Sequence, residues 1–186
     1  IIFDKENCRG YNTDIQGFLL GLKQKFNYWD KAKPVLVIGA GGASKAIINA
    51  LINQNIKEIR IMNRTENKVD ELCKKYKQIV KVKWMDPKSW LDLGLLVNSS
   101  SLGMVGYPKI NISLDKLKTR PIVYDIVYNP LETALLKEAK KNSLPFIDGL
   151  SMLIGQARES FNHWFSIYPT DSNTLKLNLL NNLEKN

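Results

Sequence analysis

Short, continuous apolar runs alternate with stretches of helical periodicity along most of this chain. After Pro34, the segment 35–38 (VLVI) is apolar at every position, which predicts a strand buried on both faces. Beyond the glycine-rich turn that follows, Ala43, Ile47 and Leu51 recur at helical spacing and predict a helix. Repeated alternation of this kind predicts an α/β domain with a doubly wound, mainly parallel sheet of about six strands and helices on both faces.

The remaining elements continue this alternation. We expect further strands at 58–62, 80–84, 95–98, 122–126 and 146–147. We expect helices at 13–26, 43–51, 65–76, 89–93, 132–141 and 150–165. The first helix starts at Thr13, which has the spacing of a capping box with Gln16, and the residues before it predict no strand or helix. Residues 171–186 are polar apart from a stripe of leucines, which fits either a loosely docked helix or a frayed tail.

The helix expected at 150–165 carries two distinct stripes. The core-facing stripe is expected to consist of Leu150, Leu153, Ile154, Ala157, Phe161 and Trp164. A second stripe of small and polar residues fits the wall of a cleft and consists of Gly149, Met152, Gln156 and Ser160. The single histidine, His163, has no second ligand or base beside it, so we interpret it as a surface or packing residue.

Composition and charge limit the possible classes of protein. The chain has 186 residues, of which 44% are hydrophobic, and no apolar run approaches the ~18 residues that a membrane-spanning helix needs. The lysines behind the net charge of +9 are scattered, which favours a solvated surface over a nucleic-acid interface. Cys8 and Cys73 belong to no disulfide or metal motif, so we expect free thiols and no metal site. We therefore expect a soluble, cytoplasmic, single-domain protein.

A glycine cluster stands between the first buried strand and the helix after it. This cluster comprises Gly39, Ala40, Gly41, Gly42 and Ala43. Glycine lets the backbone turn sharply there, and it lets pyrophosphate oxygens approach the amides at a helix N-terminus, where the helix dipole favours negative charge. The context of strand, turn and helix predicts a dinucleotide-binding site, and the alternative is a purely structural turn.

The end of the next strand bears on the choice of cofactor. NAD sites usually place a carboxylate about 20 residues after the glycines, where it binds the ribose hydroxyls. Here the segment reads Asn63, Arg64, Thr65, with Lys68 shortly afterwards, so no acidic side chain opposes a 2′-phosphate. This favours NADP. The alternative interpretation is that Thr65 caps the following helix and Arg64 is merely solvated.

Six segments in order resemble the shikimate dehydrogenase family from about residue 7 to residue 169. They are GYNTD at 10–14, GAGGA at 39–43, NRT at 63–65, NSSSLGM at 98–104, YDIVYNP at 124–130 and DGLSMLIGQ at 148–156. Six ordered matches are more specific than any one motif. The resemblance implies a Rossmann-type domain at 1–170 that includes hinge helices at 1–30 and 149–166, followed by a tail at 171–186.

The resemblance also implies residue roles. It identifies Asp14 with the family's catalytic aspartate, which works beside a lysine to move a proton, and places Asp14, Tyr128 and Gln156 against the substrate. The implied cofactor residues are Gly39, Ala40, Gly41, Gly42, Ala43, Asn63, Arg64, Thr65, Lys68, Ser101, Ile126 and Gly149. Within that set, the glycine turn holds the pyrophosphate, the segment 63–68 holds the 2′-phosphate, and Ile126 and Gly149 line the nicotinamide pocket.

The implied activity is NADP-dependent, reversible reduction of 3-dehydroshikimate to shikimate, a step of chorismate and aromatic amino-acid biosynthesis. No segment here matches the family's N-terminal substrate domain, which carries the catalytic lysine, so we expect this chain to bind cofactor and to be inactive alone. The intact enzyme is expected to be a monomer or a homodimer. Two alternatives stay open, namely a quinate/shikimate dehydrogenase that uses NAD and a non-catalytic nucleotide-binding module.

Overall fold

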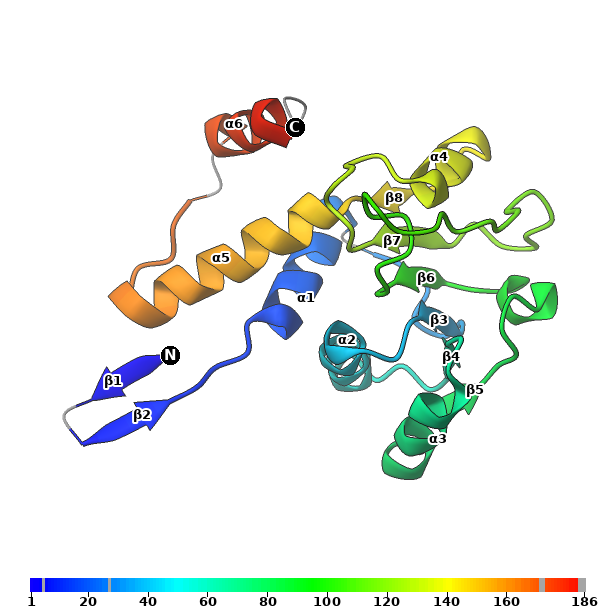
Figure 1. Ribbon diagram of the computed structural model, residues 1–186, viewed down its shortest axis with the longest axis horizontal. Helices are drawn as coiled ribbons and strands as arrows, with labels where there is room; N and C mark the ends of the chain where they lie inside the picture. The colour runs from blue at the N-terminus through cyan, green and yellow to red at the C-terminus, as the bar shows by residue number, and fades with distance from the viewer. Residues whose placement is uncertain (5, 27, 171–172, 184–186) are drawn as a thin grey trace.

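A six-stranded, entirely parallel sheet forms the centre of the molecule in the computed structural model, which describes residues 1–4, 6–26, 28–170 and 173–183 (Figure 1). The strand order is β5-β4-β3-β6-β7-β8. The strands are β3 (Val35–Ile38), β4 (Ile59–Met62), β5 (Ile79–Lys81), β6 (Leu95–Asn98), β7 (Ile122–Asp125) and β8 (Phe146–Ile147). The predicted α/β class is confirmed, and the crevice between the carboxyl ends of β3 and β6 is the point at which the winding of the sheet reverses.

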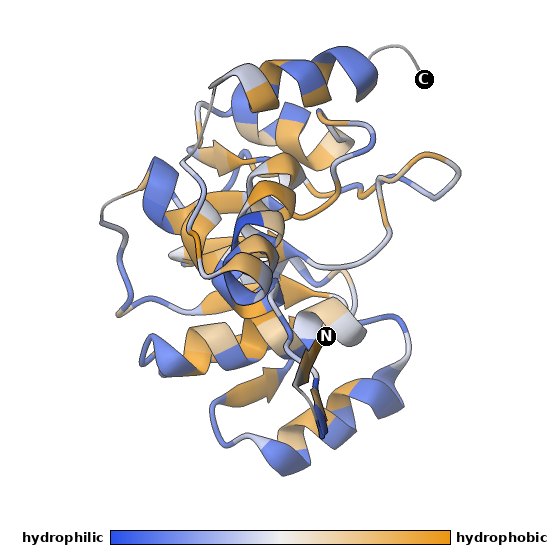
Figure 2. Cartoon of the chain, turned by 90° about the vertical axis from the view of Figure 1, so that its left-hand side faces the viewer, coloured by the Kyte–Doolittle hydropathy of each residue, from blue (hydrophilic) through white to orange (hydrophobic). Residues whose placement is uncertain are grey.

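Helices cover both faces of this sheet. They are α1 (Asp14–Lys25), α2 (Gly42–Asn53), α3 (Glu66–Lys75), α4 (Ala134–Lys141) and α5 (Gly149–Phe165), while α6 (Asn173–Leu183) follows α5 and lies away from the sheet (Figure 1). Side chains alternate along each strand, so that Val35 and Val37 pack with α1 and α2 in one core cluster while Leu36 and Ile38 pack with α4 in the other. Because both faces are covered, β3 is apolar at every position, and the apolar residues gather at the centre in Figure 2.

The segment before the first helix differs from expectation. A short antiparallel hairpin, β1 (Ile2–Asp4) and β2 (Asn7–Arg9), precedes α1, where we expected no strand or helix. The expected capping box is also wrong, because the Thr13 hydroxyl makes no capping bond and lies 3.4 Å from Ser160 Oγ. Asn12 takes its place, since its Oδ1 accepts a hydrogen bond from the Asp14 amide at 2.8 Å.

Two weakly patterned elements are shorter than expected. β5 ends at Lys81 instead of continuing to Trp84, because it is an edge strand with Val80 43% exposed and only Ile79 buried. The expected helix at 89–93 is a single 3₁₀ turn, η1 (Pro87–Trp90). The Asp86 side chain caps that turn by accepting a hydrogen bond from the Lys88 amide at 3.0 Å. Because β5 ends at Lys81, Trp84 lies outside the strand.

Glycines allow α1 and α5 to lie against each other (Figure 1). A Cβ atom at Gly155 would lie 2.8 Å from the Gly17 Cα, and one at Gly17 would lie 2.8 Å from the Met152 carbonyl oxygen.

The expected core stripe of α5 is wrong in its second half. Phe161 and Trp164 are 39% and 58% exposed, because that half extends past the sheet. Of the stripe expected to face a cleft, Met152, Gln156 and Ser160 lie against α1 or Thr13 before it, and Gly149 lies against Ile126.

Three smaller expectations have definite outcomes. Residues Asn173–Leu183 form the helix α6, in which Leu175 and Leu177 are exposed, so the helical alternative for the tail is correct over these residues. The rest of the tail, 171–172 and 184–186, lies outside the described residues. His163 is a packing residue, since its ring stacks on Tyr11 with centroids 4.2 Å apart. Cys8 and Cys73 are free thiols.

The Tyr124 hydroxyl predicts a stabilising substitution. Tyr124 is fully buried and stacks on Phe18 with ring centroids 4.9 Å apart, but its hydroxyl has no hydrogen-bond partner among the described residues. Burial raises the pKa of this phenol, with a further contribution from the Asp148 carboxylate. An unpaired buried hydroxyl is costly, so Tyr124→Phe should increase the free energy of unfolding by about 1 kcal/mol. Urea unfolding tests this, with the exposed Tyr128→Phe as control; a clear loss of stability in Tyr124→Phe would show that the hydroxyl is bonded.

Candidate functional site

A crevice opens at the carboxyl edge of the sheet, where β4, β3 and β6 end. It has a volume of about 420 Å³. Its lining is formed by Gly39, Ala40, Gly41, Asn63, Arg64, Thr65, Lys68, Trp84, Ser99, Ser100, Ser101, Leu102, Tyr107 and Pro108. The structure therefore brings together the first three residues of the glycine turn, the segment 63–68 and Ser101, which are far apart in the sequence. Gly42 and Ala43, predicted with them, begin α2 and are not lining residues. Ligands of open α/β sheets bind at this position.

The glycines of the turn are there for different reasons. Gly39 has φ of +112°, and a Cβ there would lie 2.9 Å from Ser99 Oγ, so the fold itself requires glycine. A Cβ at Gly41 or Gly42 would meet no protein atom within 4 Å, and Gly41 has an ordinary extended backbone with φ of −90°. The purely structural alternative therefore explains Gly39 but not the other two. Gly41 and Gly42 leave open space in front of the amides of α2, which begins at Gly42 and continues through Ala43.

The β4 side of the crevice presents unpaired positive charge. Arg64 and Lys68 are exposed, and no hydrogen bond or ion pair joins either of them to another described residue. Asn63 shapes the turn by donating from Nδ2 to the Thr65 carbonyl oxygen at 2.7 Å. Thr65 occupies the N-cap position of α3, yet its side chain makes no capping bond, so the capping part of the alternative interpretation is wrong. The exposed position of Arg64 agrees with the other part, a solvated side chain. No carboxylate lines this crevice, and the two cations suit an anionic group.

A buried polar network shapes the β6 side of the crevice. Asn98, at the end of β6, accepts hydrogen bonds on Oδ1 from the Ser100 amide and hydroxyl at 3.1 and 2.7 Å. Its Nδ2 donates to the Leu102 carbonyl oxygen at 3.0 Å and to Asp125 Oδ1 at 2.8 Å. These bonds hold the loop that carries Ser101 into the crevice wall.

Asp125, at the end of β7, is the centre of that network. Its carboxylate is fully buried and accepts hydrogen bonds from Thr133 Oγ1 at 2.6 Å and from the Val127 amide at 3.1 Å. Burial raises the pKa of Asp125 to about 6, although the hydrogen bonds from Thr133, Val127 and Asn98 act in the opposite direction. Sequence reasoning missed the role of Asp125. The one sequence feature that could have indicated it is a carboxylate at the end of a strand that is otherwise apolar on both faces.

The raised pKa of Asp125 predicts a specific pH dependence of stability. The native state binds a proton near pH 6, whereas the unfolded chain binds it near pH 4, so this group adds stability as pH falls through that window and removes it as pH rises. The free energy of unfolding of wild type minus that of Asp125→Asn should therefore increase between pH 7 and pH 4.5, by roughly 1–3 kcal/mol. Urea titrations of both proteins at several pH values measure it. A constant difference would mean an ordinary pKa.

Asp14 and Gln156, two of the three residues with expected substrate roles, lie at the contact between α1 and α5. Gln156 Nε2 donates a hydrogen bond to Asp14 Oδ1, and the packing is so close that a Cβ at Gly17 would lie 2.6 Å from Gln156 Cγ. Ile126 and Gly149 are also neighbours, since a Cβ at Gly149 would overlap the Ile126 carbonyl oxygen. Tyr128 is 45% exposed. The structure thus pairs Asp14 with Gln156 and Ile126 with Gly149, while none of these residues lines the crevice itself.

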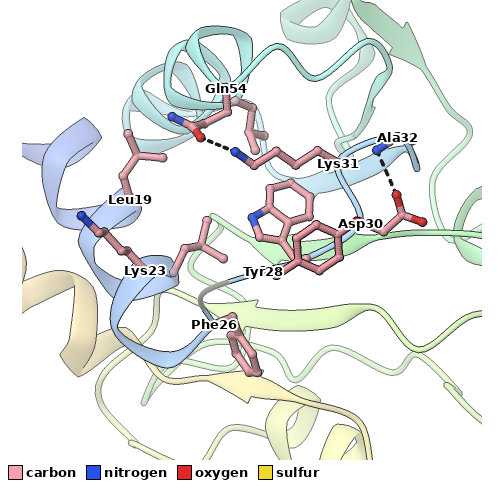
Figure 3. Close-up of a pocket in the computed structure, with 11 residues that line it drawn as sticks. Leu19, Lys23, Phe26, Tyr28, Asp30, Lys31, Ala32 and Gln54 are labelled. Atoms are coloured by element: carbon pink, nitrogen blue, oxygen red, sulfur yellow. Dashed lines mark hydrogen bonds between the residues drawn. The ribbon is translucent and has the colours of Figure 1, made fainter.

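A larger cavity, of about 690 Å³, lies among the C-terminal half of α1, the loop after it and the end of α2 (Figure 3). Lys31 spans part of it and donates to Gln54 Oε1 at 2.6 Å, with Tyr28 and Phe26 nearby. None of the predicted site residues lines this cavity.

Within the described ranges, no helix has the length and apolar character needed to cross a membrane.

Comparisons with known proteins agree with this geometry. Residues 22–92 match the family model described as shikimate/quinate 5-dehydrogenase. A shikimate dehydrogenase (NADP(+)) of Sinorhizobium medicae is 36% identical over 95% of the chain, which spans 63% of that relative.

Solved structures give the same result. The shikimate dehydrogenase of Aquifex aeolicus matches with a TM-score of 0.78 and 36% identity, over 90% of this chain and 61% of that one. The shikimate 5-dehydrogenase of Thermus thermophilus in complex with NADP(H) and shikimate matches with a TM-score of 0.75 and 30% identity, over 87% and 59% of the two chains.

Proposed function

Since this chain belongs to the shikimate dehydrogenase family, we propose that its 186 residues bind NADP(H) and form the cofactor side of an enzyme that interconverts 3-dehydroshikimate and shikimate. One observation carries the proposal. The fold does not require glycine at positions 41 and 42, and the absence of side chains there leaves space in front of the N-terminus of α2. The unpaired cations Arg64 and Lys68 line the same crevice as Gly41. A relative named for NADP(+) and a neighbour solved with NADP(H) and shikimate support it.

The residues present fit the nucleotide. The amides that follow Gly41 would hold the pyrophosphate, while Arg64 and Lys68, with Asn63 and Thr65 shaping the turn, would hold the 2′-phosphate. Ser101 would form the opposite wall, and Ile126 and Gly149 would lie beside the nicotinamide. When bound, the nicotinamide supplies or accepts the hydride. The protein's own contribution on this side is to bind and orient the cofactor.

Asp14 is proposed as the acid/base group of this half of the site. Its Oδ1 is held by Gln156 Nε2, and no hydrogen bond between described residues involves Oδ2, so Oδ2 is available to exchange a proton with a substrate hydroxyl. In the family this aspartate works with a lysine that no motif of this chain supplies. Tyr128 and Gln156 are proposed to contact the substrate from the same side. The matched relatives are longer than this chain, and the remaining groups are proposed to lie in that additional length.

Activity measurements test the proposal as a whole. The 186-residue chain should bind NADP(H) but oxidise no shikimate above background, because positioning of the substrate requires the rest of the site. Supplying the substrate domain, in cis or as a separate chain, should give NADP-dependent shikimate oxidation. In that restored enzyme, Asp14→Asn should lower kcat by about a hundredfold with little change in KM, since general acid/base catalysis contributes roughly 10²–10⁴-fold. Rapid turnover by the 186 residues alone would contradict the account.

A further inference from the structure

Two aromatic side chains line the crevice and have no role in the site as described so far. They are Trp84, which follows β5, and Tyr107, in the loop after β6. The phosphate-binding groups occupy other parts of the lining, namely the glycine turn and the segment 63–68. The crevice therefore contains flat apolar surface beyond what phosphates need, and such surface suits the face of a heteroaromatic ring.

Trp84 is held firmly by the backbone around it. Beyond the end of β5, the Val82 amide still bonds the Ile61 carbonyl oxygen at 3.1 Å, so the chain stays against β4 up to the crevice. The chain then turns sharply at Met85, which has φ of +56° and whose amide lies 3.3 Å from Met62 Sδ. The indole is partly buried against the core cluster on that face of the sheet. Trp84 is thus a fixed wall whose remaining surface lines the crevice.

Tyr107 is a poorer candidate for the same task. Its side chain is 51% exposed, and it lies in a loop that contains two glycines in the left-handed region, Gly103 and Gly106. This loop follows β6 and brings Tyr107 to the crevice. A half-exposed side chain loses rotamer freedom when a base stacks on it, which reduces the gain in binding free energy.

The chemistry of the nucleotide connects Trp84 with Arg64. In adenosine 2′-phosphate the base and the phosphate are attached to adjacent carbons of one ribose, so adenine must lie within one sugar of the group that binds the phosphate. Arg64 follows β4, and Trp84 follows β5, the strand paired with β4 on its outer side. We propose that the Trp84 indole is the platform on which adenine stacks, while Arg64 and Lys68 bind the 2′-phosphate. This inference rests on the proposed function.

The test uses adenosine 2′,5′-bisphosphate, which contains the adenine half of NADP and no nicotinamide. Trp84→Ala should weaken its binding about tenfold or more, because stacking of one base on an aromatic side chain is typically worth that much. Trp84→Phe should retain affinity within about threefold, since phenylalanine also offers an aromatic face. Inorganic pyrophosphate, which lacks the base, should bind all three proteins equally. Calorimetric titration measures each affinity, and Trp164→Ala, at an exposed tryptophan on α5, is the matched control.

Fluorescence supplies a second measurement. The bisphosphate should quench the tryptophan emission of wild type, and this quenching should disappear in Trp84→Phe although the ligand still binds. Unchanged affinity of Trp84→Ala for the bisphosphate would overturn the assignment. Equal weakening of pyrophosphate and bisphosphate binding would also overturn it, because that result indicates structural damage. A wild-type chain that binds neither NADPH nor the bisphosphate would instead refute the proposed function.

Discussion

Gly41→Val should abolish NADP(H) binding and leave the fold intact. The extended backbone of Gly41 suits a β-branched residue, and its added Cβ would meet no protein atom within 4 Å, so the folded chain has room for the side chain. The same side chain would occupy the space through which a pyrophosphate must approach the amides of α2. We expect the affinity to fall at least about a hundredfold, or roughly 3 kcal/mol.

Circular dichroism and a cofactor titration on the same sample measure this result. Gly10→Val is a matched control, because a Cβ at Gly10 also meets nothing within 4 Å and Gly10 lies outside the crevice. This control should bind NADPH like wild type. Unchanged affinity in a folded Gly41→Val protein would place the cofactor elsewhere.

Arg64→Ala should remove the preference for NADP over NAD. The Arg64 guanidinium has no partner in the described chain and no nearby carboxylate in the crevice, so its charge is available to a 2′-phosphate. We expect NADP affinity to fall about 10–100-fold, because a charge-assisted hydrogen bond contributes roughly 1.5–3 kcal/mol. NAD affinity should change little, since NAD lacks that phosphate.

Parallel titrations of NADP and NAD test this expectation, with Arg120→Ala as the control. Arg120 lies outside the crevice, next to the start of β7, where it donates a hydrogen bond to the Ser143 carbonyl oxygen. Equal NADP affinity in wild type and Arg64→Ala would contradict the role of Arg64. A wild-type preference for NAD would favour the quinate/shikimate alternative.

The parts of the fold that sequence reasoning predicted correctly are those with strong local signals. β3 is apolar at every position and is followed at once by glycines and a periodic helix, so the strand, the turn and α2 could each be placed from neighbouring residues. The dinucleotide fingerprint named the glycine turn and the segment 63–68, and the family resemblance added Ser101. Residues from these three segments do lie together in the crevice.

Features that depend on tertiary neighbours could not be predicted. The core stripe of α5 was assigned wrongly in its second half because periodicity does not show where a helix leaves the sheet, and that half has exposed aromatic residues. The bond between Asn98 and Asp125 depends on β6 lying beside β7. Trp84 was placed inside a strand because its hydrophobicity resembles that of a strand residue, whereas the chain turns at Met85 and leaves the indole in the crevice.

Titration of the wild-type chain with NADPH, followed by the fluorescence of the reduced nicotinamide, measures cofactor binding by these 186 residues without the remainder of the enzyme. We expect saturable binding of one NADPH per chain, with NADH binding at least about tenfold more weakly because it lacks the phosphate that Arg64 and Lys68 would bind. The absence of saturable NADPH binding by the folded chain, or equal affinity for NADPH and NADH, would contradict this expectation.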